Sequence, residues 1–304
     1  MKILVASSSP LAKNLLNHIK NSDHQLLGGI SSPDRASGRG QSVSSNDFAS
    51  YCQEIGVSCY KPSTNEELAD ILQKTQAELV ITLAYGRLIK TNELQIPKHG
   101  WLNVHFSLLP RWRGAAPVQR AIAAGDEQSG LTVFKLEQGL DTGPIYSTLS
   151  YPLNDRSRSD EVLKDLSSLC IQPVNQALIM IAAGEPATTQ ESDGVTLAPK
   201  ILKSEGRIDW NQDSKLLDSQ IRAFQPWPGA YTSFNGTRIE IIEARVSEAH
   251  GVAGEVLSIN PLLVGTGSGS GSLEIIRVKP ENKREMSSSD WLRGARITLP
   301  CAFE

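Results

Sequence analysis

An asparagine and a histidine stand two residues apart at the end of a short apolar run. Asn103 and His105 close the segment Trp101–His105, whose residues predict a buried β-strand. Because side chains alternate along a strand, the amide and the imidazole point to the same side. In open α/β sheets the carboxyl ends of strands border the ligand crevice. We therefore expect both side chains to line such a crevice.

A carboxylate that can join them lies further along the chain. Asp141 stands between Gly139 and Gly143, and residues without a side chain allow a loop to approach a partner closely. Asn103, His105 and Asp141 together form a candidate catalytic set.

This set suits the transfer of an acyl group to an amine without a covalent intermediate. The attacking amine must lose a proton, and the tetrahedral oxyanion needs donors fixed where negative charge develops. We expect Asn103 and a protonated His105 to be those donors, while Asp141 orients His105, favours its charged form and helps to remove the proton. No serine or cysteine nucleophile and no metal-ligand cluster accompanies them. On spacing alone, a purely structural histidine remains an alternative.

The elements that must position these residues alternate between strand-like and helix-like segments. Short β-branched or leucine-rich runs alternate with stretches that carry apolar residues at helical spacing, which is typical of βαβ units. This pattern predicts an α/β, Rossmann-like domain with a mostly parallel sheet. The predicted strands are Lys2–Ala6, Gln25–Ile30, Val57–Tyr60, Leu79–Ala84, Trp101–His105 and Leu131–Lys135, and the predicted helices are Pro10–Ile19, Ser45–Ile55, Asn65–Lys74, Ala116–Ala124 and Asp160–Ala183.

The sequence changes in character after Ala198-Pro199-Lys200. Short alternating runs separated by turn residues predict a small C-terminal β-barrel of the OB type. We expect a catalytic domain over 1–189, a linker over 190–205 and the barrel over 206–304. The predicted barrel strands are Thr237–Val246, Gly254–Ile259, Pro261–Gly265 and Leu273–Val278.

Composition argues against several classes of protein. Hydrophobic residues make up 39% and charged residues 21% of 304, which is ordinary for a globular chain. The N-terminus lacks the apolar stretch of a signal peptide, and no run reaches the ~18 apolar residues of a membrane span. The four cysteines form no CxxC pair, so we expect a cytoplasmic protein without membrane attachment. The net charge of −3 does not by itself indicate a nucleic-acid partner.

Two motifs resemble a known family. The segment from Asn103 to Ile122 reads NVHFSLLPRWRGAAPVQRAI, and the later motif reads GLDTG. Both resemble the signature of the 10-formyltetrahydrofolate-dependent formyltransferases, and the RWRGAAP wording is most similar to the branch that formylates methionyl-tRNA. The likeness runs along nearly the whole chain, since Arg207–Trp210 and Ile221–Ala230 resemble the start of that branch's C-terminal barrel, which would bind tRNA.

The resemblance implies a reaction and its residues. It implies that the formyl group of 10-formyltetrahydrofolate passes to the α-amino group of methionyl initiator tRNA, without a metal, in an enzyme that we expect to be monomeric. Asn103, His105 and Asp141 match the family's catalytic residues. The implied folate contacts are Ser107, Leu108, Leu109 and Pro110, together with Tyr85, Gly86, Arg87, Leu88 and Ile89.

A loop after the second predicted strand matches the family's tRNA-contacting insertion. Pro33–Gly40 carries Arg35 and Arg39, and a guanidinium can pair with a phosphate or stack on a base. The sequence also departs from the family, because Ser7-Ser8-Ser9 stands where relatives usually have Gly-Thr-Pro.

Other functions remain open at this point. A formyltransferase that acts on an amino-sugar nucleotide would share the same three residues, and a catalytically idle nucleic-acid-binding relative would keep the fold. A nicotinamide dehydrogenase is disfavoured, because no GxGxxG motif follows the first predicted strand.

Overall fold

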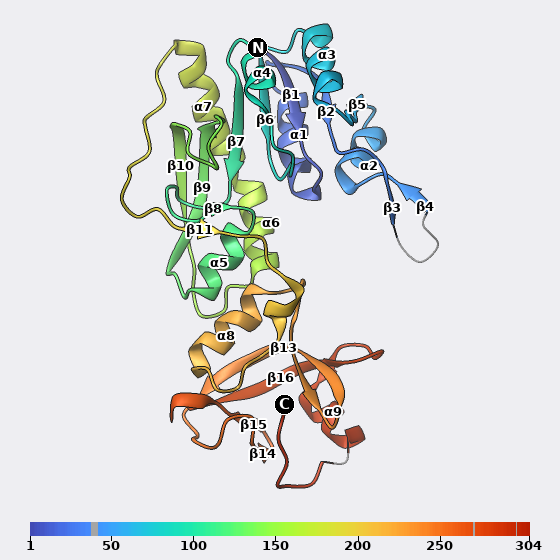
Figure 1. Cartoon of the computed structure of the whole chain (residues 1–304), viewed down its shortest axis with the longest axis vertical. Coiled ribbons are helices and arrows are strands. Elements are labelled where there is room, and N and C mark those ends of the chain that lie inside the picture. Colours follow the sequence, from blue (N-terminus) through green and yellow to red (C-terminus); the bar gives the residue numbers. More distant parts are fainter. Residues whose placement is uncertain (38–41, 270, 296) are drawn as a thin grey trace. The chain divides into compact units, whose positions relative to one another are not determined.

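A seven-stranded sheet forms the framework of the N-terminal part of the chain (Figure 1). In this computed structural model, which describes residues 1–37, 42–269, 271–295 and 297–304, five of its strands run parallel. They are β1 (Lys2–Ala6), β2 (Gln25–Ile30), β5 (Cys59–Tyr60), β6 (Leu79–Thr82) and β7 (Trp101–His105). β9 (Gln128–Lys135) pairs antiparallel to β7, and β10 (Ile145–Pro152) follows it at the edge, giving the order β10-β9-β7-β6-β1-β2-β5.

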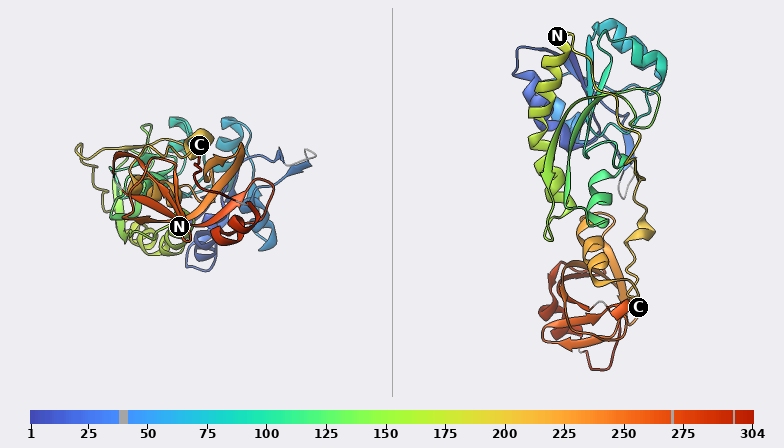
Figure 2. Two further views of the ribbon diagram at one scale, coloured as in Figure 1. Left: turned by 90° about the horizontal axis from the view of Figure 1, so that it is seen from below. Right: turned by 90° about the vertical axis from the view of Figure 1, so that its left-hand side faces the viewer.

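Helices cover both faces of this sheet (Figure 2). The parallel strands are consequently buried on both sides, as the fully buried Ile3, Leu4 and Val5 of β1 illustrate. Side-chain caps begin two helices: Asn46 accepts from the Ala49 N–H, and Thr64 accepts from the Glu67 N–H. The helices between residues 1 and 189 are α1 (Lys13–Lys20), α2 (Asp47–Glu54), α3 (Asn65–Thr75), α4 (Thr91–Gln95), α5 (Pro117–Ala123), α6 (Ser159–Leu169) and α7 (Ile171–Ala183).

The long helix predicted over Asp160–Ala183 is interrupted at Cys170. Pro173 has no N–H to donate to the carbonyl of Leu169, so the helical ladder loses a bond at this point. By length and composition alone, Ser159–Ala183 could cross a membrane. In α7, however, Val174, Ala177 and Leu178 are buried, as expected for a helix that packs on a protein core.

By contacts, the chain divides into two compact units. The first comprises Met1–Pro117, Ser129–Pro152 and Leu163–Ala198, and the second comprises Val118–Gln128, Leu153–Val162 and Pro199–Glu304.

The C-terminal sheet in the second unit is antiparallel and barrel-like. Its path is β12-β13-β16-β15-β14, with β17 (Met286–Ser287) paired to β16. The last residues of the chain bond to both edges of this path, because Glu304 pairs with Ser233 while Cys301 accepts from the Val256 N–H. The path strands are β12 (Ala230–Phe234), β13 (Thr237–Ser247), β14 (Val256–Ile259), β15 (Leu262–Gly265) and β16 (Ser272–Pro280), and the helices of this part are α8 (Ser214–Ala223) and α9 (Ser288–Ala295).

An aromatic cluster fills the centre of the second unit. Trp210 and Trp291 each lie 5.8 Å from Phe303, ring centre to ring centre, and Phe234 lies 5.2 Å from it. Trp210 also donates its indole N–H to Thr232 Oγ1. The C-terminal tail is thereby tied to the core by packing as well as by backbone bonds.

The predicted α/β sheet followed by a C-terminal β domain is confirmed, while several single elements were missed. The strand β10 and the helices α4, α8 and α9 had no counterpart in the sequence-based prediction. The insertion after β2 contains a two-stranded antiparallel sheet of β3 (Arg35–Ser37) and β4 (Ser42–Ser44), where a loop was expected.

Candidate active site

The structure brings His105 and Asp141 together at the carboxyl end of β7. His105 Nδ1 lies 3.8 Å from Asp141 Oδ2, and both side chains are largely buried. Asn103 lies two residues earlier on the same strand and is partly exposed. An amide, an imidazole and a carboxylate are thus positioned by one strand end and one loop.

Two glycines allow the Asp141 loop to adopt its close geometry. A Cβ atom on Gly143 would lie 1.8 Å from the carbonyl oxygen of Lys135, and one on Gly139 would lie 2.1 Å from Thr142 Oγ1. Asp141 itself has φ +50°, in the left-handed region that aspartate tolerates better than most residues. The GLDTG motif therefore has a steric reason at both of its ends.

Burial and two acceptor groups set the environment of His105. Burial lowers the pKa of His105, against smaller opposing effects from the Asp141 carboxylate and the Trp112 carbonyl. Since a carbonyl only accepts, Nε2–H donates to the Trp112 oxygen at 2.8 Å. In its neutral form the ring therefore has its lone pair on Nδ1, which faces Asp141.

A threonine on the neighbouring strand orients Asn103. Thr82 of β6 pairs with Asn103 in register, and its hydroxyl donates to Asn103 Oδ1 at 2.9 Å. The Oδ1 end of the amide is thereby held toward β6, and the Nδ2 hydrogens point elsewhere. Sequence reasoning missed Thr82, although a threonine in the apolar run LVIT was a usable signal.

A second threonine fixes the segment that follows the histidine. Thr132 of β9 is fully buried and donates to the Ser107 carbonyl at 2.7 Å, while it accepts from the Leu109 N–H at 3.1 Å. Ser107 in turn donates to the carbonyl of Arg111 at 2.6 Å. Leu108 and Pro110 are partly exposed. The segment predicted to contact folate is thus fixed to β9 by the side chain of Thr132.

The predicted second wall of the folate site follows β6. Tyr85 and Ile89 are buried, Gly86 has φ +72°, and the Leu88 side chain is 81% exposed. Arg87 is engaged elsewhere, since its guanidinium donates to the Pro62 carbonyl and to Asn65 Oδ1. Among the residues that the structure describes, Tyr85 Oη has no hydrogen-bond partner.

The serine-rich first turn closes onto this wall. The Ser8 N–H donates to the Ala84 carbonyl at 3.2 Å, and its hydroxyl donates to the Tyr85 carbonyl at 3.3 Å. β1 and β6 are neighbours, and the chain leaves β1 in one direction and β6 in the other, which is the switch point where open α/β sheets bind ligands. Ser7-Ser8-Ser9, which stands where relatives usually have Gly-Thr-Pro, therefore forms a turn that is fixed by hydrogen bonds to the segment after β6.

Of the two arginines predicted to contact tRNA, the structure describes only one. Arg35 begins β3 and is exposed. Arg39 lies outside the described residues.

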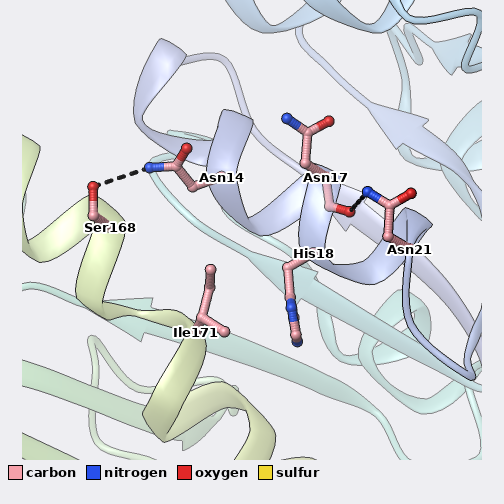
Figure 3. A pocket seen from close by; sticks show the side chains of 6 residues that line it. All are labelled: Asn14, Asn17, His18, Asn21, Ser168 and Ile171. Atoms are coloured by element: carbon pink, nitrogen blue, oxygen red, sulfur yellow. Dashed lines mark hydrogen bonds between the residues drawn. The ribbon is translucent and has the colours of Figure 1, made fainter.

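A separate open cavity of about 470 Å³ lies on α1, beside α6 and α7 (Figure 3). Five of its six lining residues have polar side chains, and Asn14 Nδ2 donates to Ser168 Oγ there. None of the predicted site residues lines it. The lining residues are Asn14, Asn17, His18, Asn21, Ser168 and Ile171.

Within the part of the chain that the structure describes, no group of three His, Cys, Asp or Glu residues is arranged to hold a metal ion.

Comparison with known families identifies the class of protein. The formyl transferase family model matches residues 1–169, and the model of the formyl transferase C-terminal domain matches residues 200–296. The chain belongs to the formyl transferase family.

Full-length relatives narrow this class. A methionyl-tRNA formyltransferase of Cutibacterium acnes is 37% identical, with 98% of each chain covered. Another protein of that name, from Salinispora arenicola, is 36% identical over 98% of each chain.

Solved structures share the fold at lower identity. HypX from Aquifex aeolicus in complex with tetrahydrofolic acid has a TM-score of 0.66 at 18% identity, and the match covers 96% of this chain and 46% of HypX. This chain thus spans about half the length of HypX. An N-formyltransferase of Helicobacter canadensis, in complex with folinic acid and dTDP-3-aminofucose, has a TM-score of 0.68 at 17% identity and covers 90% and 98% of the two chains.

Proposed function

We propose that this protein transfers the formyl group of 10-formyltetrahydrofolate to the α-amino group of methionyl initiator tRNA. The observation that carries the proposal is the full-length similarity to methionyl-tRNA formyltransferases, which includes both family domains. The meeting of His105 and Asp141 at a strand end supports it, because acyl transfer to an amine needs a base and fixed charge there.

The folate site would lie between the Ser107–Pro110 segment and the Tyr85–Ile89 turn. Burial raises the pKa of Tyr85 against a smaller opposing effect of the nearby Arg87 guanidinium, so its hydroxyl stays protonated, and among the described residues it makes no hydrogen bond of good geometry. An unsatisfied buried donor beside an exposed leucine fits a ligand that has both polar and apolar surface. 10-Formyltetrahydrofolate would supply the electrophilic formyl carbon.

The three polar residues would then divide the chemistry. Asn103 Nδ2 donates to the oxyanion that forms when the amine attacks. Neutral His105 takes the amine's proton on Nδ1, and Asp141 stabilises the resulting imidazolium across 3.8 Å. The same proton is available to the departing tetrahydrofolate nitrogen when the intermediate collapses. No net charge is left on the enzyme.

We assign tRNA recognition to the C-terminal barrel over 206–304 and to the insertion Pro33–Gly40, through Arg35 and Arg39. The reaction would occur in the cytoplasm, where charged tRNA is available, and the working unit would be a monomer. The segment 1–189 would hold the catalytic groups.

Transfer to an amino-sugar nucleotide is the second candidate, favoured by the fold shared with the Helicobacter canadensis enzyme. Incubation with 10-formyltetrahydrofolate labelled in the formyl group, and with either methionyl-tRNA or a dTDP-amino sugar, separates the two. We expect label in the tRNA fraction alone. Label in the sugar, or in neither acceptor, would refute the proposal.

A further inference from the structure

The segment from Gln190 to Ala198 lies between the two family-model matches, and we predicted it to be part of a linker. In the structure it belongs to the first unit and packs on the residues that hold the proposed catalytic groups. The short strands β8 (Arg113–Gly114) and β11 (Leu197–Ala198) pair in parallel there.

Gln190 contacts the Asp141 loop through both amide hydrogens. Its Nε2 donates to the carbonyl of Asp141 at 2.8 Å and to the carbonyl of Gly143 at 2.7 Å. Its Oε1 accepts from Arg113 Nη2 at 2.7 Å and from Nε at 3.2 Å. Each polar atom of this side chain is therefore used.

These contacts close a ring around Asp141. The N–H of Gly114, which follows Arg113, donates to Asp141 Oδ2 at 2.8 Å. Asp141 is thus held by its main chain through Gln190 and by its carboxylate through Gly114. Because φ at Asp141 is +50°, this backbone conformation needs such support from outside the loop.

The same segment also holds the partner of the histidine. Thr196 Oγ1 accepts from the Trp112 N–H at 2.8 Å, and the Thr196 carbonyl accepts from the Arg113 N–H at 2.9 Å. Trp112 in turn provides the carbonyl that fixes the His105 tautomer. Residues 190–198 therefore support both sides of the His105–Asp141 pair.

We propose that Gln190 is a positioning residue for the formyl transfer, which fixes the Asp141 carboxylate relative to His105 by joining the Asp141 loop to Arg113. The inference rests on the function proposed above. A primary amide of this length is required, since a carboxylate offers no donors to the two carbonyls and asparagine is one methylene shorter.

The test is a kinetic comparison of Gln190→Ala, Gln190→Glu and wild type with methionyl-tRNA. We expect both variants to lose about 10- to 100-fold in kcat, with KM for folate and for tRNA changed little, because a displaced catalytic group affects the reacting geometry. Gln190→Glu is nearly isosteric and keeps the acceptor for Arg113, but it sets a carboxylate oxygen against the two carbonyls, so we expect it to lose at least as much kcat as Gln190→Ala.

A control is available on the far side of the first unit. Asn17 Nδ2 donates to the Tyr51 hydroxyl and so joins α1 to α2. Asn17→Ala removes an amide clamp that does not touch the Asp141 loop, so we expect a similar change in melting temperature and an unchanged kcat. Equal kcat losses in the Gln190 and Asn17 variants would reduce Gln190 to a structural role.

An Asp141→Asn background shows whether Gln190 acts through Asp141. We expect Gln190→Ala to change kcat by less than about twofold in that background, because coupled residues are not additive. The full loss there would overturn the inference, as would wild-type kcat in the single variant. If Asp141→Asn and Asn103→Ala both retained wild-type turnover, the proposed catalytic assignment itself would fail.

Discussion

The catalytic end of β7 and the C-terminal barrel use polar residues in opposite ways. Around His105 the polar groups are buried or partly buried, and each is fixed by a short bond to a backbone group or a neighbouring side chain. On the strands of the barrel, Arg277 and Lys279 are exposed and pair with carboxylates, Arg277 with Glu285 at 2.6 Å and Lys279 with Glu240 at 3.6 Å. Buried, fixed dipoles favour a transition state, whereas exposed charges steer and hold a polyanion.

This difference predicts separate kinetic effects. Substitutions at the strand end should lower kcat, and substitutions on the barrel should raise KM for tRNA in a salt-dependent way. The barrel has no excess of positive charge with which to bind a polyanion, since residues 206–304 carry 11 Lys and Arg against 12 Asp and Glu, a net of −1. Binding must therefore depend on where those cations lie.

The largest effect is expected from Asn103→Ala. Loss of one oxyanion donor costs about 10²- to 10³-fold in turnover, and KM for tRNA should stay near its wild-type value. Steady-state formylation kinetics measure both. Wild-type turnover in this variant would remove Asn103 from the mechanism.

The next effect tests the steric requirement of the Asp141 loop. In Gly143→Ala the new Cβ would lie 1.8 Å from the Lys135 carbonyl, so the loop must shift. We expect about a 100-fold loss of kcat, the scale of a 1 Å misplacement, and a loss of about 1–3 kcal/mol in the free energy of unfolding. Denaturant unfolding and kinetics together measure this.

Gly294 in α9 supplies the control for that substitution. A Cβ there meets nothing within 4 Å, so Gly294→Ala should leave both kcat and stability close to wild type or slightly improved. A normal kcat for Gly143→Ala would mean that the loop tolerates displacement.

A third prediction concerns pH. The base must be neutral, so kcat should fall as the pH drops through the pKa of His105, which burial holds below its usual 6.5. The Asp141 carboxylate raises that pKa, so in Asp141→Asn the acidic limb of the residual rate should move to lower pH. A pH–kcat profile tests this, and a limb that moves to higher pH contradicts it.

The smallest effect is expected on the barrel. Lys283 and Arg284 are exposed after β16. Replacing both by alanine should raise KM for tRNA a few-fold and reduce the slope of log KM against log salt by about one for each lost phosphate contact. A change in kcat instead would show that the two regions are not separate in function.

The sequence predicted the central strands well because their signal is local. β1 and β7 are apolar runs that are largely buried on both faces, β2 is buried over its last three residues, and the predicted limits of all three agree with the structure. The break in the long helix could also have been predicted, because Pro173 stands just after the break, in the first turn of α7. The short helices α4 and α9 were missed, since few residues carry their periodicity.

The support of the site could not be predicted in the same way. Gln190 and Thr196 lie in a polar segment without periodicity, and they act on residues about 50 to 85 positions away. The pKa of His105 is lowered by burial, and parts of the chain distant in sequence cause that burial. The direction of this shift could therefore not be predicted from the residues next to His105 in the sequence. Whether Asn103, His105 and Asp141 catalyse the reaction remains a prediction.

One measurement tests the central claim most directly: the rate at which the purified protein transfers labelled formyl from 10-formyltetrahydrofolate to methionyl initiator tRNA and to methionyl elongator tRNA. We predict rapid, stoichiometric labelling of the initiator and much slower labelling of the elongator. Equal rates would contradict initiator recognition, and the absence of label in both would contradict the proposed reaction.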